Sequence, residues 1–385
     1  MVNLSEERLA FAASVRAWVD KHCSKQRALE LEQREHQYPF ELWDEMTAAG
    51  FHGVGIDEAY GGSGGTPVDT AILAMELSRN LGGLAWVWAI SSFAGARAIA
   101  LAGSEEQKKQ HLTALAAGEC RFSIAVTEPS GGTDLLGGMR TRAVPVGDRW
   151  RISGQKMWST GARDADHLLL LAKTGEGEGR QARTTLFLVP TTAAGLTFRY
   201  IPKLGMRAIG SCEVFLDEVE VGPECVLGEV DRGFKSIVGA LNNERILSAA
   251  LALGMLNGVL EEAVRYAGER EAFDRPIGGH QAVAHMVADI AIWRKQAELL
   301  VFDAAWREEQ GLDCETEAKI AKVATSEYAV QAADHGIQIL GGMGISTETH
   351  MQRYWRDVRQ FRVAPISNEM ARNSIAESFG LPRSY

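Results

Sequence analysis

Apolar residues recur at helical spacing through roughly the first 118 residues of the chain. Leu73, Leu77 and Leu81, for example, follow one another at intervals of four and so share one face of a helix. Ser104 and Gln107 have the spacing of a capping box, in which each side chain bonds to the other residue's backbone at the start of a helix. The pattern therefore predicts that this first block is mostly helical.

The pattern changes between residues 120 and 231, where short runs of β-branched and aromatic residues alternate with turn residues. Short strands without helices between them favour a small antiparallel barrel or sandwich. The expected strands cover residues 123–126, 150–152, 167–172, 184–189, 196–200 and 212–216.

Helical spacing returns after residue 233 in long, alanine-rich runs at 237–270, 280–309 and 315–340, which leave room only for short turns. Such runs are typical of a helical bundle. We therefore expect an α+β multidomain protein. Its parts are an N-terminal helical domain at 1–119, a middle β domain at 120–231 and a C-terminal four-helix bundle domain at 232–385.

Composition narrows the class of protein. The 385 residues, 46% of them hydrophobic and 23% charged, are those of an ordinary globular chain, and the net charge of -10 argues against a nucleic-acid partner. The 5 cysteines have no C-x-x-C spacing and are odd in number, so a reduced compartment, the cytoplasm, is expected. We see no signal-like start and no stretch that is apolar over a full membrane span, so no membrane partner is predicted.

Other kinds of site have weak support in the sequence. The 9 histidines do not pair with Cys, Asp or Glu at a metal-binding spacing, so no metal is expected. Gly342, Met343 and Gly344 resemble the start of a dinucleotide fingerprint, but no strand precedes them. The glycine-rich loop at 61–65 lacks the lysine and hydroxyl of a phosphate-binding loop and is expected to be a turn. No G-x-S-x-G motif supports a serine nucleophile.

Two segments of the β block carry more specific chemistry. Residues 126–134 place a hydroxyl and free backbone N–H groups at the end of a strand, before a glycine-rich turn where the backbone can approach a planar ring or a pyrophosphate closely. Residues 154–161 end a strand on an aromatic ring and a hydroxyl. We expect one edge of the β block to present both segments to the same flavin.

Together these segments resemble the flavin-binding signatures of the acyl-CoA dehydrogenases. The resemblance extends along nearly the whole chain. It implies a helical, β, helical architecture, FAD bound between the barrel and the last bundle, and a homotetramer arranged as a dimer of dimers. The other matching positions are Tyr38-Pro39, Tyr60-Gly61-Gly62, Lys203-Leu204-Gly205-Met206-Arg207, Glu244-Arg245, Arg270-Glu271-Ala272-Phe273, Gln338 to Gly342 and Arg356-Asp357.

The resemblance also implies roles for single residues around FAD. One subunit would surround the isoalloxazine ring, and a neighbouring subunit would hold the pyrophosphate and adenosine, where the guanidinium of Arg270 suits a diphosphate. The ring set is Ile124, Val126 and Thr127 at the edge, Thr133 near the cofactor phosphates and the thioester, and Trp158 and Thr160 on the other side. The second set is Arg270, Phe273, Gln338, Gly341 and Gly342, with Ser367 and Glu369 at the adenosine-contacting positions.

The usual catalytic carboxylate of this family is missing from the late loop. The family removes a proton α to a thioester while a hydride moves from the β carbon to flavin N5. The proton leaves only when donors hold the thioester oxygen and a carboxylate lies over it. Where many members have a glutamate that supplies both a carboxylate and an N–H, this chain has Pro365, which supplies neither.

A second acid stands at the position used by a subset of the family. Enzymes similar to the isovaleryl-CoA and long-chain acyl-CoA dehydrogenases carry the base on a helix of the third domain, immediately before a substrate-contacting arginine. In this chain that pair is Glu244-Arg245, so Glu244 is the expected base; a solvated or structurally paired Glu-Arg is the alternative. Thr133, Asn242 and Arg245 are the expected substrate contacts, and Asn242 stands where some relatives have aspartate.

Two functions of different kinds follow from the resemblance. The first is an FAD-dependent acyl-CoA dehydrogenase of fatty acid metabolism, reoxidised by an electron-transfer flavoprotein. The second keeps the fold, flavin and thioester binding without α,β-dehydrogenation. It would be a lyase such as a sulfinate desulfinase, a flavin oxygenase or a non-catalytic acyl-thioester binder. Both a CoA thioester and a carrier-protein thioester are compatible with the sequence.

Overall fold

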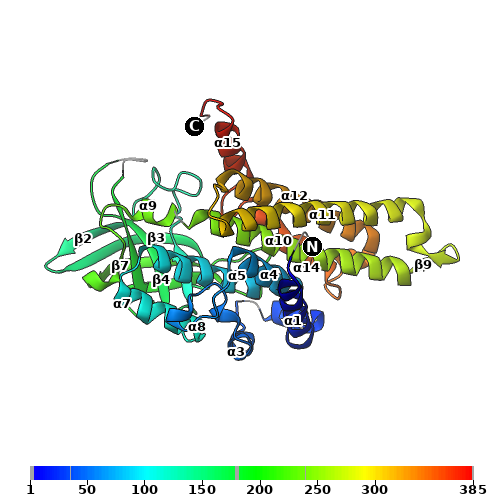
Figure 1. Cartoon of the computed structure of the whole chain (residues 1–385), viewed down its shortest axis with the longest axis horizontal. Coiled ribbons are helices and arrows are strands. Elements are labelled where there is room, and N and C mark those ends of the chain that lie inside the picture. The colour runs from blue at the N-terminus through cyan, green and yellow to red at the C-terminus, as the bar shows by residue number, and fades with distance from the viewer. Residues whose placement is uncertain (1–3, 35, 178–181, 239, 384–385) are drawn as a thin grey trace.

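The computed structural model describes residues 4–34, 36–177, 182–238 and 240–383. A β-rich region lies at one end of the molecule, a bundle of long helices extends to the other end, and the N-terminal helices lie against both (Figure 1). This helical, β, helical order agrees with the architecture expected from the spacing of apolar residues.

The N-terminal region is helical, as its apolar spacing predicts. Ser104 and Gln107 form the expected capping box, with N–H to side-chain distances of 3.0 and 3.2 Å. Pro67 stands in the first turn of α4, directly after the turn at 61–65. The helices are α1 (Glu6–His22), α2 (Lys25–Gln33), α3 (Phe40–Ala48), α4 (Pro67–Ser78), α5 (Gly82–Ile90), α6 (Ala98–Ala102), α7 (Glu105–Gln107) and α8 (Thr113–Ala116), with the π-helical segments η3 (Ser91–Arg97) and η4 (Lys108–Leu112) and the 3₁₀ turns η1 (Phe51–Gly53) and η2 (Glu58–Tyr60).

Two helical stretches of the described chain, Gly82–Ala102 and Leu241–Glu269, are long and apolar enough to cross a membrane. The expectation that no stretch is apolar over a full span is therefore wrong. Most of each apolar window, 72% and 89% respectively, is buried inside the protein. Burial of this extent is what a core helix requires, and length and composition alone are weak grounds for a membrane span.

The middle region is an 8-stranded sheet in the order β6-β7-β3-β2-β4-β5-β8, with β1 paired to β4. The prediction of an antiparallel sheet is wrong in part, because β1 and β2 both pair with β4 in parallel. β2 was not predicted because Pro145 interrupts it and most of its residues are exposed. The strands are β1 (Phe122–Ala125), β2 (Arg142–Val146), β3 (Arg149–Thr160), β4 (His167–Lys173), β5 (Thr184–Pro190), β6 (Leu196–Tyr200), β7 (Ser211–Val221) and β8 (Val226–Leu227).

Three long helices dominate the C-terminal region and pack along one another, which confirms the predicted helical bundle. Helix α4 from the N-terminal region also packs on the first of them, α10 (Leu241–Glu269). Helices α14 and α15 pack on the third, α12 (Glu315–Leu340). The helical run predicted at 237–270 is divided between α9 and α10. The elements are α9 (Gly233–Val238), α10 (Leu241–Glu269), the hairpin strands β9 (Glu271–Ala272) and β10 (Arg275–Pro276), α11 (Gln281–Glu309), α12 (Glu315–Leu340), α13 (Gly342–Ile345), α14 (Met351–Val358) and α15 (Asn368–Ser378), with 3₁₀ turns η6 (Pro223–Cys225), η7 (Ile277–Gly279) and η8 (Arg359–Arg362).

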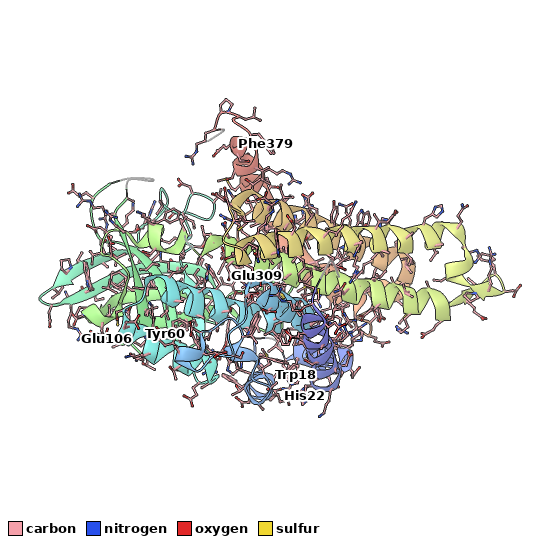
Figure 2. The ribbon with its side chains drawn as sticks, viewed as in Figure 1. Trp18, His22, Tyr60, Glu106, Glu309 and Phe379 are labelled. Atoms are coloured by element: carbon pink, nitrogen blue, oxygen red, sulfur yellow. The ribbon has the colours of Figure 1, made fainter. Side chains whose placement is uncertain are left out.

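Helix α15 projects from the body of the molecule at the end that carries the C-terminus (Figure 1). Phe379, directly after this helix, has 77% of its surface exposed and lies away from the other labelled side chains (Figure 2).

The segment 203–207 and the pair Arg356-Asp357, both matched by the family resemblance, meet at the junction of the three regions. The N–H of Met206 donates to Asp357 Oδ1 at 2.5 Å, and Arg356 Nη1 donates to the carbonyl oxygen of Leu204 at 2.9 Å. Glu32 from α2 completes the junction: it accepts from the N–H of Ala208 at 3.0 Å and pairs with Arg356 at 3.4 Å. These contacts fix the middle sheet relative to both helical regions.

Asp357→Ala should lower the free energy of unfolding by about 3–5 kcal/mol. The substitution removes the acceptor of Met206 and takes a carboxylate away from Arg353, a fully buried arginine whose Nη1 lies 3.9 Å from Asp357 Oδ2. Urea denaturation followed by tryptophan fluorescence measures the loss. The control is Asp303→Ala, which removes an exposed pair with Arg307 and should change stability by less than about 1 kcal/mol. Equal losses in the two variants would contradict the role given to the junction.

Candidate functional site

Trp158 is presented to solvent by an irregularity in β3. The register between β3 and β7 shifts between Lys156 and Ser159, and Trp158 lies in this bulge with a φ of 61°. A bulge re-aims a side chain out of the regular alternation of a strand. The indole ring, 52% of whose residue surface is exposed, therefore offers a flat apolar face to a ligand.

The two signature segments, residues 126–134 and 154–161, lie side by side, as the sequence predicts. The N–H of Met157 donates to the carbonyl oxygen of Thr127 at 2.8 Å. Beneath this contact the buried Lys156 donates to the carbonyl oxygen of Val126 at 3.1 Å and to Glu128 at 2.7 Å. Burial lowers the pKa of Lys156 to about 8 against the opposing effect of Glu128. A buried pair of this kind holds both segments in one geometry because either charge alone would be costly to bury.

The other residues of the ring set differ in how accessible they are. Ile124 and Thr127 are partly buried, whereas Val126 is buried with its backbone directed to Lys156. Thr160 is buried, and its hydroxyl shares a hydrogen bond with Ser211 at 2.9 Å. Thr133 is exposed on the glycine-rich turn after β1.

Most of the second predicted set lies at the end of the bundle away from the sheet, whereas Ser367 and Glu369 stand at the start of α15, near Lys322. Arg270 ends α10 and is exposed, and the described residues include no ion-pair partner for it. Phe273 follows in the β9–β10 hairpin with 89% of its surface exposed. Gly341 has φ 59° and ψ -132°, a conformation essentially limited to glycine, and a Cβ on Gly341 or Gly342 would meet open space. Gln338 is exposed in the last turn of α12.

One chain does not bring the two predicted FAD-binding sets together. Trp158 belongs to the sheet at one end of the molecule, and the hairpin after Arg270 lies at the far end of the bundle (Figure 1). Both sets nevertheless suit FAD, because one offers an exposed aromatic face, and the other offers open glycine backbone and an arginine without an ion-pair partner among the described residues.

Glu244 lies in the first turn of α10, where the chain leaves the sheet and enters the bundle. Burial raises the pKa of its carboxyl group to about 7, although Arg245 and Lys322 act in the opposite direction. A carboxyl group titrating near neutral pH is matched to abstracting a proton under physiological conditions. The surroundings of Glu244 thus give its carboxyl group a pKa that suits a catalytic base.

Lys322 of α12 connects Glu244 with the loop that contains Pro365. The Lys322 ammonium is buried and donates to the carbonyl oxygen of Ile366 and to Asn368 Oδ1, the latter at 2.8 Å. Burial lowers the pKa of Lys322 to about 8, while Glu369 and Glu244 favour its charged form. Lys322 therefore binds the late loop, which lacks the family's usual carboxylate, and also acts on the charge of the alternative acid, Glu244.

The remaining predicted residues make mostly internal contacts. Asn242 accepts from Arg245 Nη1 at 3.1 Å, and Arg245 is buried with its Nε atom lacking a hydrogen-bond partner among the described residues. Ser367 caps α15 by accepting from the N–H of Met370 at 3.2 Å. Glu369 is exposed in the first turn of α15.

Lys322 and Asn368 were missed by reasoning from the sequence. A lysine within a regular helix gives no sign of burial, since a helical face is assigned from apolar spacing and lysine is usually exposed. Asn368 stands in the late loop motif, but its buried hydrogen bonds to Lys322 and Ser326 depend on how α15 packs on α12.

The chain matches three family models, described as the N-terminal, middle and C-terminal domains of acyl-CoA dehydrogenase, at residues 5–119, 123–219 and 231–380. It is 34% identical over 384 residues to acyl-CoA dehydrogenase FadE12 of Mycobacterium tuberculosis, which covers 99% of this chain and 98% of the relative. The caffeyl-CoA reductase-Etf complex subunit CarC of Acetobacterium woodii is 32% identical, with 93% and 94% covered. The solved structure of butyryl-CoA dehydrogenase from Megasphaera elsdenii superposes with a TM-score of 0.93 at 28% identity, covering 99% of this chain and 100% of that one.

Lys322→Met should move the acidic limb of the pH profile for thioester-driven flavin reduction to higher pH. In the wild type, the rate should rise with pH through about 7, as Glu244 loses its proton. Protonated Lys322 favours the charged form of Glu244, so its removal should raise the pKa of that carboxyl further. Stopped-flow absorbance under anaerobic conditions measures the profile.

The control for this profile is Lys295→Met, which removes a lysine on α11 that is 52% exposed and paired with Glu298. Its profile should coincide with that of the wild type. A Lys322→Met variant with an unchanged acidic limb would show that the lysine has only a structural role.

Proposed function

Because this chain belongs to the acyl-CoA dehydrogenase family, we propose that it oxidises the α,β bond of an acyl thioester with Glu244 as the catalytic base. The enzyme is an FAD-dependent oxidoreductase acting on CH–CH groups. Bound FAD supplies the acceptor for the β hydride. The protein must bind the thioester, orient its α carbon and remove the α proton.

The observation that carries the proposal is the environment of Glu244. The carboxyl group is desolvated enough to raise its pKa to about 7, and Arg245 and Lys322 still favour its charged form. Such a group is partly ionised at neutral pH and is basic enough to accept a proton. A solvated Glu-Arg pair, one form of the alternative, does not account for these surroundings, since Arg245 is itself buried and bonded to Asn242. The other form, a structurally paired Glu-Arg, is tested by the Glu244→Gln variant below.

Pro365 restricts how the thioester can be held. Proline has no N–H, so position 365 cannot donate a hydrogen bond to the thioester oxygen. The next carbonyl group, that of Ile366, accepts from the Lys322 ammonium. The loop therefore acts as an anchor for Lys322, and the donors to the developing enolate come from other groups of the site.

Changed chemistry is not favoured for this chain. A desulfinase, an oxygenase or a non-catalytic binder would give no role to the partly buried carboxyl group of Glu244, whose pKa is raised to about 7 by desolvation. The family models cover the three regions of an acyl-CoA dehydrogenase, and the relatives named above include acyl-CoA dehydrogenases that match almost the full chain.

The remaining parts of the proposal concern the substrate, the electron acceptor, the oligomeric state and the cellular compartment. We assign an acyl-CoA of fatty acid metabolism as the substrate, with a carrier-protein thioester as the alternative, and an electron-transfer flavoprotein as the acceptor. The acceptor is supported by the similarity to a subunit named for a complex with Etf. We assign a homotetramer; the positions of β3 and β9 at opposite ends of one chain support a site completed by another copy (Figure 1). The cytoplasm is supported by the free cysteines at positions 23, 120, 212, 225 and 314.

Glu244→Gln should lower the rate of flavin reduction by acyl-CoA by roughly two to four orders of magnitude. Glutamine keeps the shape of the side chain but cannot accept the α proton, so FAD content and thioester affinity should be retained. Anaerobic bleaching of the flavin with straight, branched and aromatic acyl-CoAs measures the rate and identifies the preferred acyl chain. Near-normal bleaching by the variant would eliminate Glu244 as the base.

The double variant Glu244→Gln, Pro365→Glu tests whether the late loop still accepts a base. Glutamate at 365 restores both a carboxylate and an N–H, but in a loop shaped around proline. We therefore expect partial recovery of flavin reduction. Should the wild type fail to reduce its flavin with any acyl thioester, the dehydrogenase proposal fails.

Arg270→Ala should weaken FAD affinity by roughly ten- to a hundredfold, the effect of losing a charge-assisted hydrogen bond to a phosphate. Because the arginine would reach the cofactor of another subunit, the oligomer should dissociate more readily as FAD is lost. FAD release and sedimentation measure the two effects. The control is Arg275→Ala on the same hairpin, whose side chain contacts His280 at 3.0 Å. An unchanged FAD affinity in Arg270→Ala would remove this role.

A further inference from the structure

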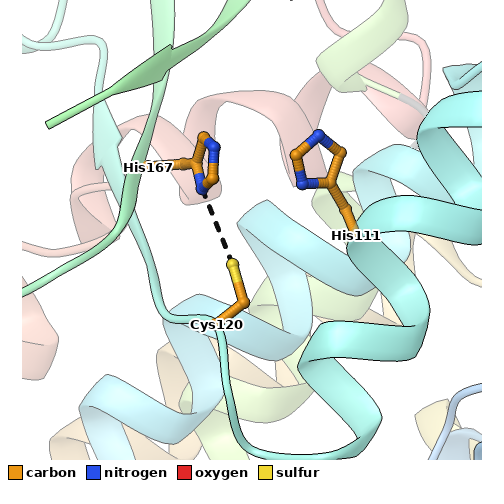
Figure 3. Close-up of side chains that lie close together, drawn as sticks. All are labelled: His111, Cys120 and His167. Atoms are coloured by element: carbon orange, nitrogen blue, oxygen red, sulfur yellow. Dashed lines mark hydrogen bonds between the residues drawn. The ribbon is translucent and has the colours of Figure 1, made fainter. Parts of the chain in front are cut away.

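Three potential metal ligands meet where the N-terminal helices contact the sheet. His111 comes from η4, Cys120 from the segment before β1, and His167 is the first residue of β4. Their side chains point toward one another (Figure 3), and one ligand atom from each lies within 4.8 Å of the others. The spacing along the chain does not reveal this cluster, because 8 residues lie between His111 and Cys120, and His167 belongs to a strand much later in the chain.

The parallel pairing of β1 with β4 produces the cluster. Phe122 stands opposite His167 in this register, so Cys120, two residues earlier, is carried alongside the histidine. Cys120 Sγ lies 3.6 Å from His167 Nδ1. A tetrahedral zinc ion with Zn–S of about 2.3 Å and Zn–N of about 2.0–2.1 Å separates its sulfur and nitrogen ligands by about 3.5 Å. The two atoms therefore already have the spacing of zinc ligands.

The rings are held by packing rather than by hydrogen bonds. His167 stacks on Phe122 at 5.3 Å, and His111 meets both rings edge-on at 5.8 and 4.9 Å. Within the described residues, neither ring nitrogen of His111 has a hydrogen-bond partner, and His167 has only the thiol of Cys120. The His111 residue is 7% exposed, and its ring lines the groove described below, so its nitrogens are free to bind a ligand that enters from that side. An ion would satisfy all three side chains together.

An entry path leads to the same side chains. His111 and His167 line a groove of about 1010 Å³ between the helices and the sheet, together with Gln107, Gln110 and Glu106. Cys120 is buried. A metal held by three protein ligands here would keep its fourth position open to water from the groove.

We propose that His111, Cys120 and His167 form a binding site for a divalent transition-metal ion, with zinc as the best match to the two imidazoles and one thiolate. Cysteine and histidine are the ligands that zinc prefers, and the three residues come from two regions of the protein. Binding exchanges the thiol proton of Cys120 for a metal–sulfur bond and releases that proton to solvent. The ion would join η4 to β1 and β4 and stabilise this junction in proportion to its occupancy.

The test uses the reduced, FAD-loaded protein, stripped with EDTA and then dialysed against Zn²⁺. Elemental analysis should find about one zinc ion per chain, and zinc should raise Tm. Co²⁺ in place of zinc should give the visible d–d bands of a tetrahedral thiolate site, at wavelengths longer than those of the flavin. A wild type that binds neither ion, or whose bound Co²⁺ lacks these bands, overturns the proposal without reference to any variant.

Two variants separate a site from adventitious binding. His111→Phe keeps an aromatic ring against Phe122 but has no nitrogen, and Cys120→Ser removes the sulfur; both should lose the bound zinc and the rise in Tm while keeping FAD. The control is Cys225→Ser, because Cys225 is the partly buried cysteine that lines the same groove outside the cluster. Zinc retained by both cluster variants, or lost equally by the control, contradicts the assignment.

The test of the metal site and the test of the proposed function have independent outcomes. Flavin reduction by acyl-CoA should persist in the zinc-free wild type, since the cluster lies at the start of β1 and the signature segment with Thr127 follows its end. Loss of zinc binding with intact flavin reduction therefore bears on the site alone.

Discussion

The arrangement of the three regions depends on the buried carboxylate of Asp357, which accepts from the N–H of Met206 and lies beside the guanidinium of Arg353. A buried carboxylate and a buried arginine are stable only in the geometry that pairs them. This constraint matters for function because Trp158 is on the sheet and Glu244 is on a helix of the bundle. Residues on separate regions can act on one substrate only if the regions hold a fixed relation, since small misplacements greatly reduce the rate.

Burial also sets the chemistry of the proposed base. Burial raises the pKa of Glu244 to about 7, because desolvation outweighs the effect of the cations Arg245 and Lys322. The Lys322 ammonium, held by Ile366 and Asn368, keeps the charged form accessible. In this chain the late loop has no carboxylate at position 365. It positions a cation that acts on Glu244, and Pro365 stands beside the carbonyl group that receives this cation.

The two candidate ligand sites lie at opposite ends of β1. Beyond its carboxyl end, the signature segment with Thr127 and the neighbouring Trp158 present a surface suited to the flavin. At its amino end, Cys120 and two histidines converge with little hydrogen bonding of their own. One short strand thus connects the cofactor site to the proposed metal site, and the pairing of β1 with β4 determines the geometry of the second.

The sequence by itself determined the order of helical and β regions, the long helices, the capping box at Ser104 and the family, because apolar periodicity and short motifs are local properties. It also placed the candidate base at Glu244. The tertiary structure decided the parallel pairing of β4, the burial of Lys322 and the meeting of His111 with Cys120. These features depend on which faces pack together, and a pKa depends on the solvent that packing removes. Neither quantity is encoded in the spacing of residues along one segment.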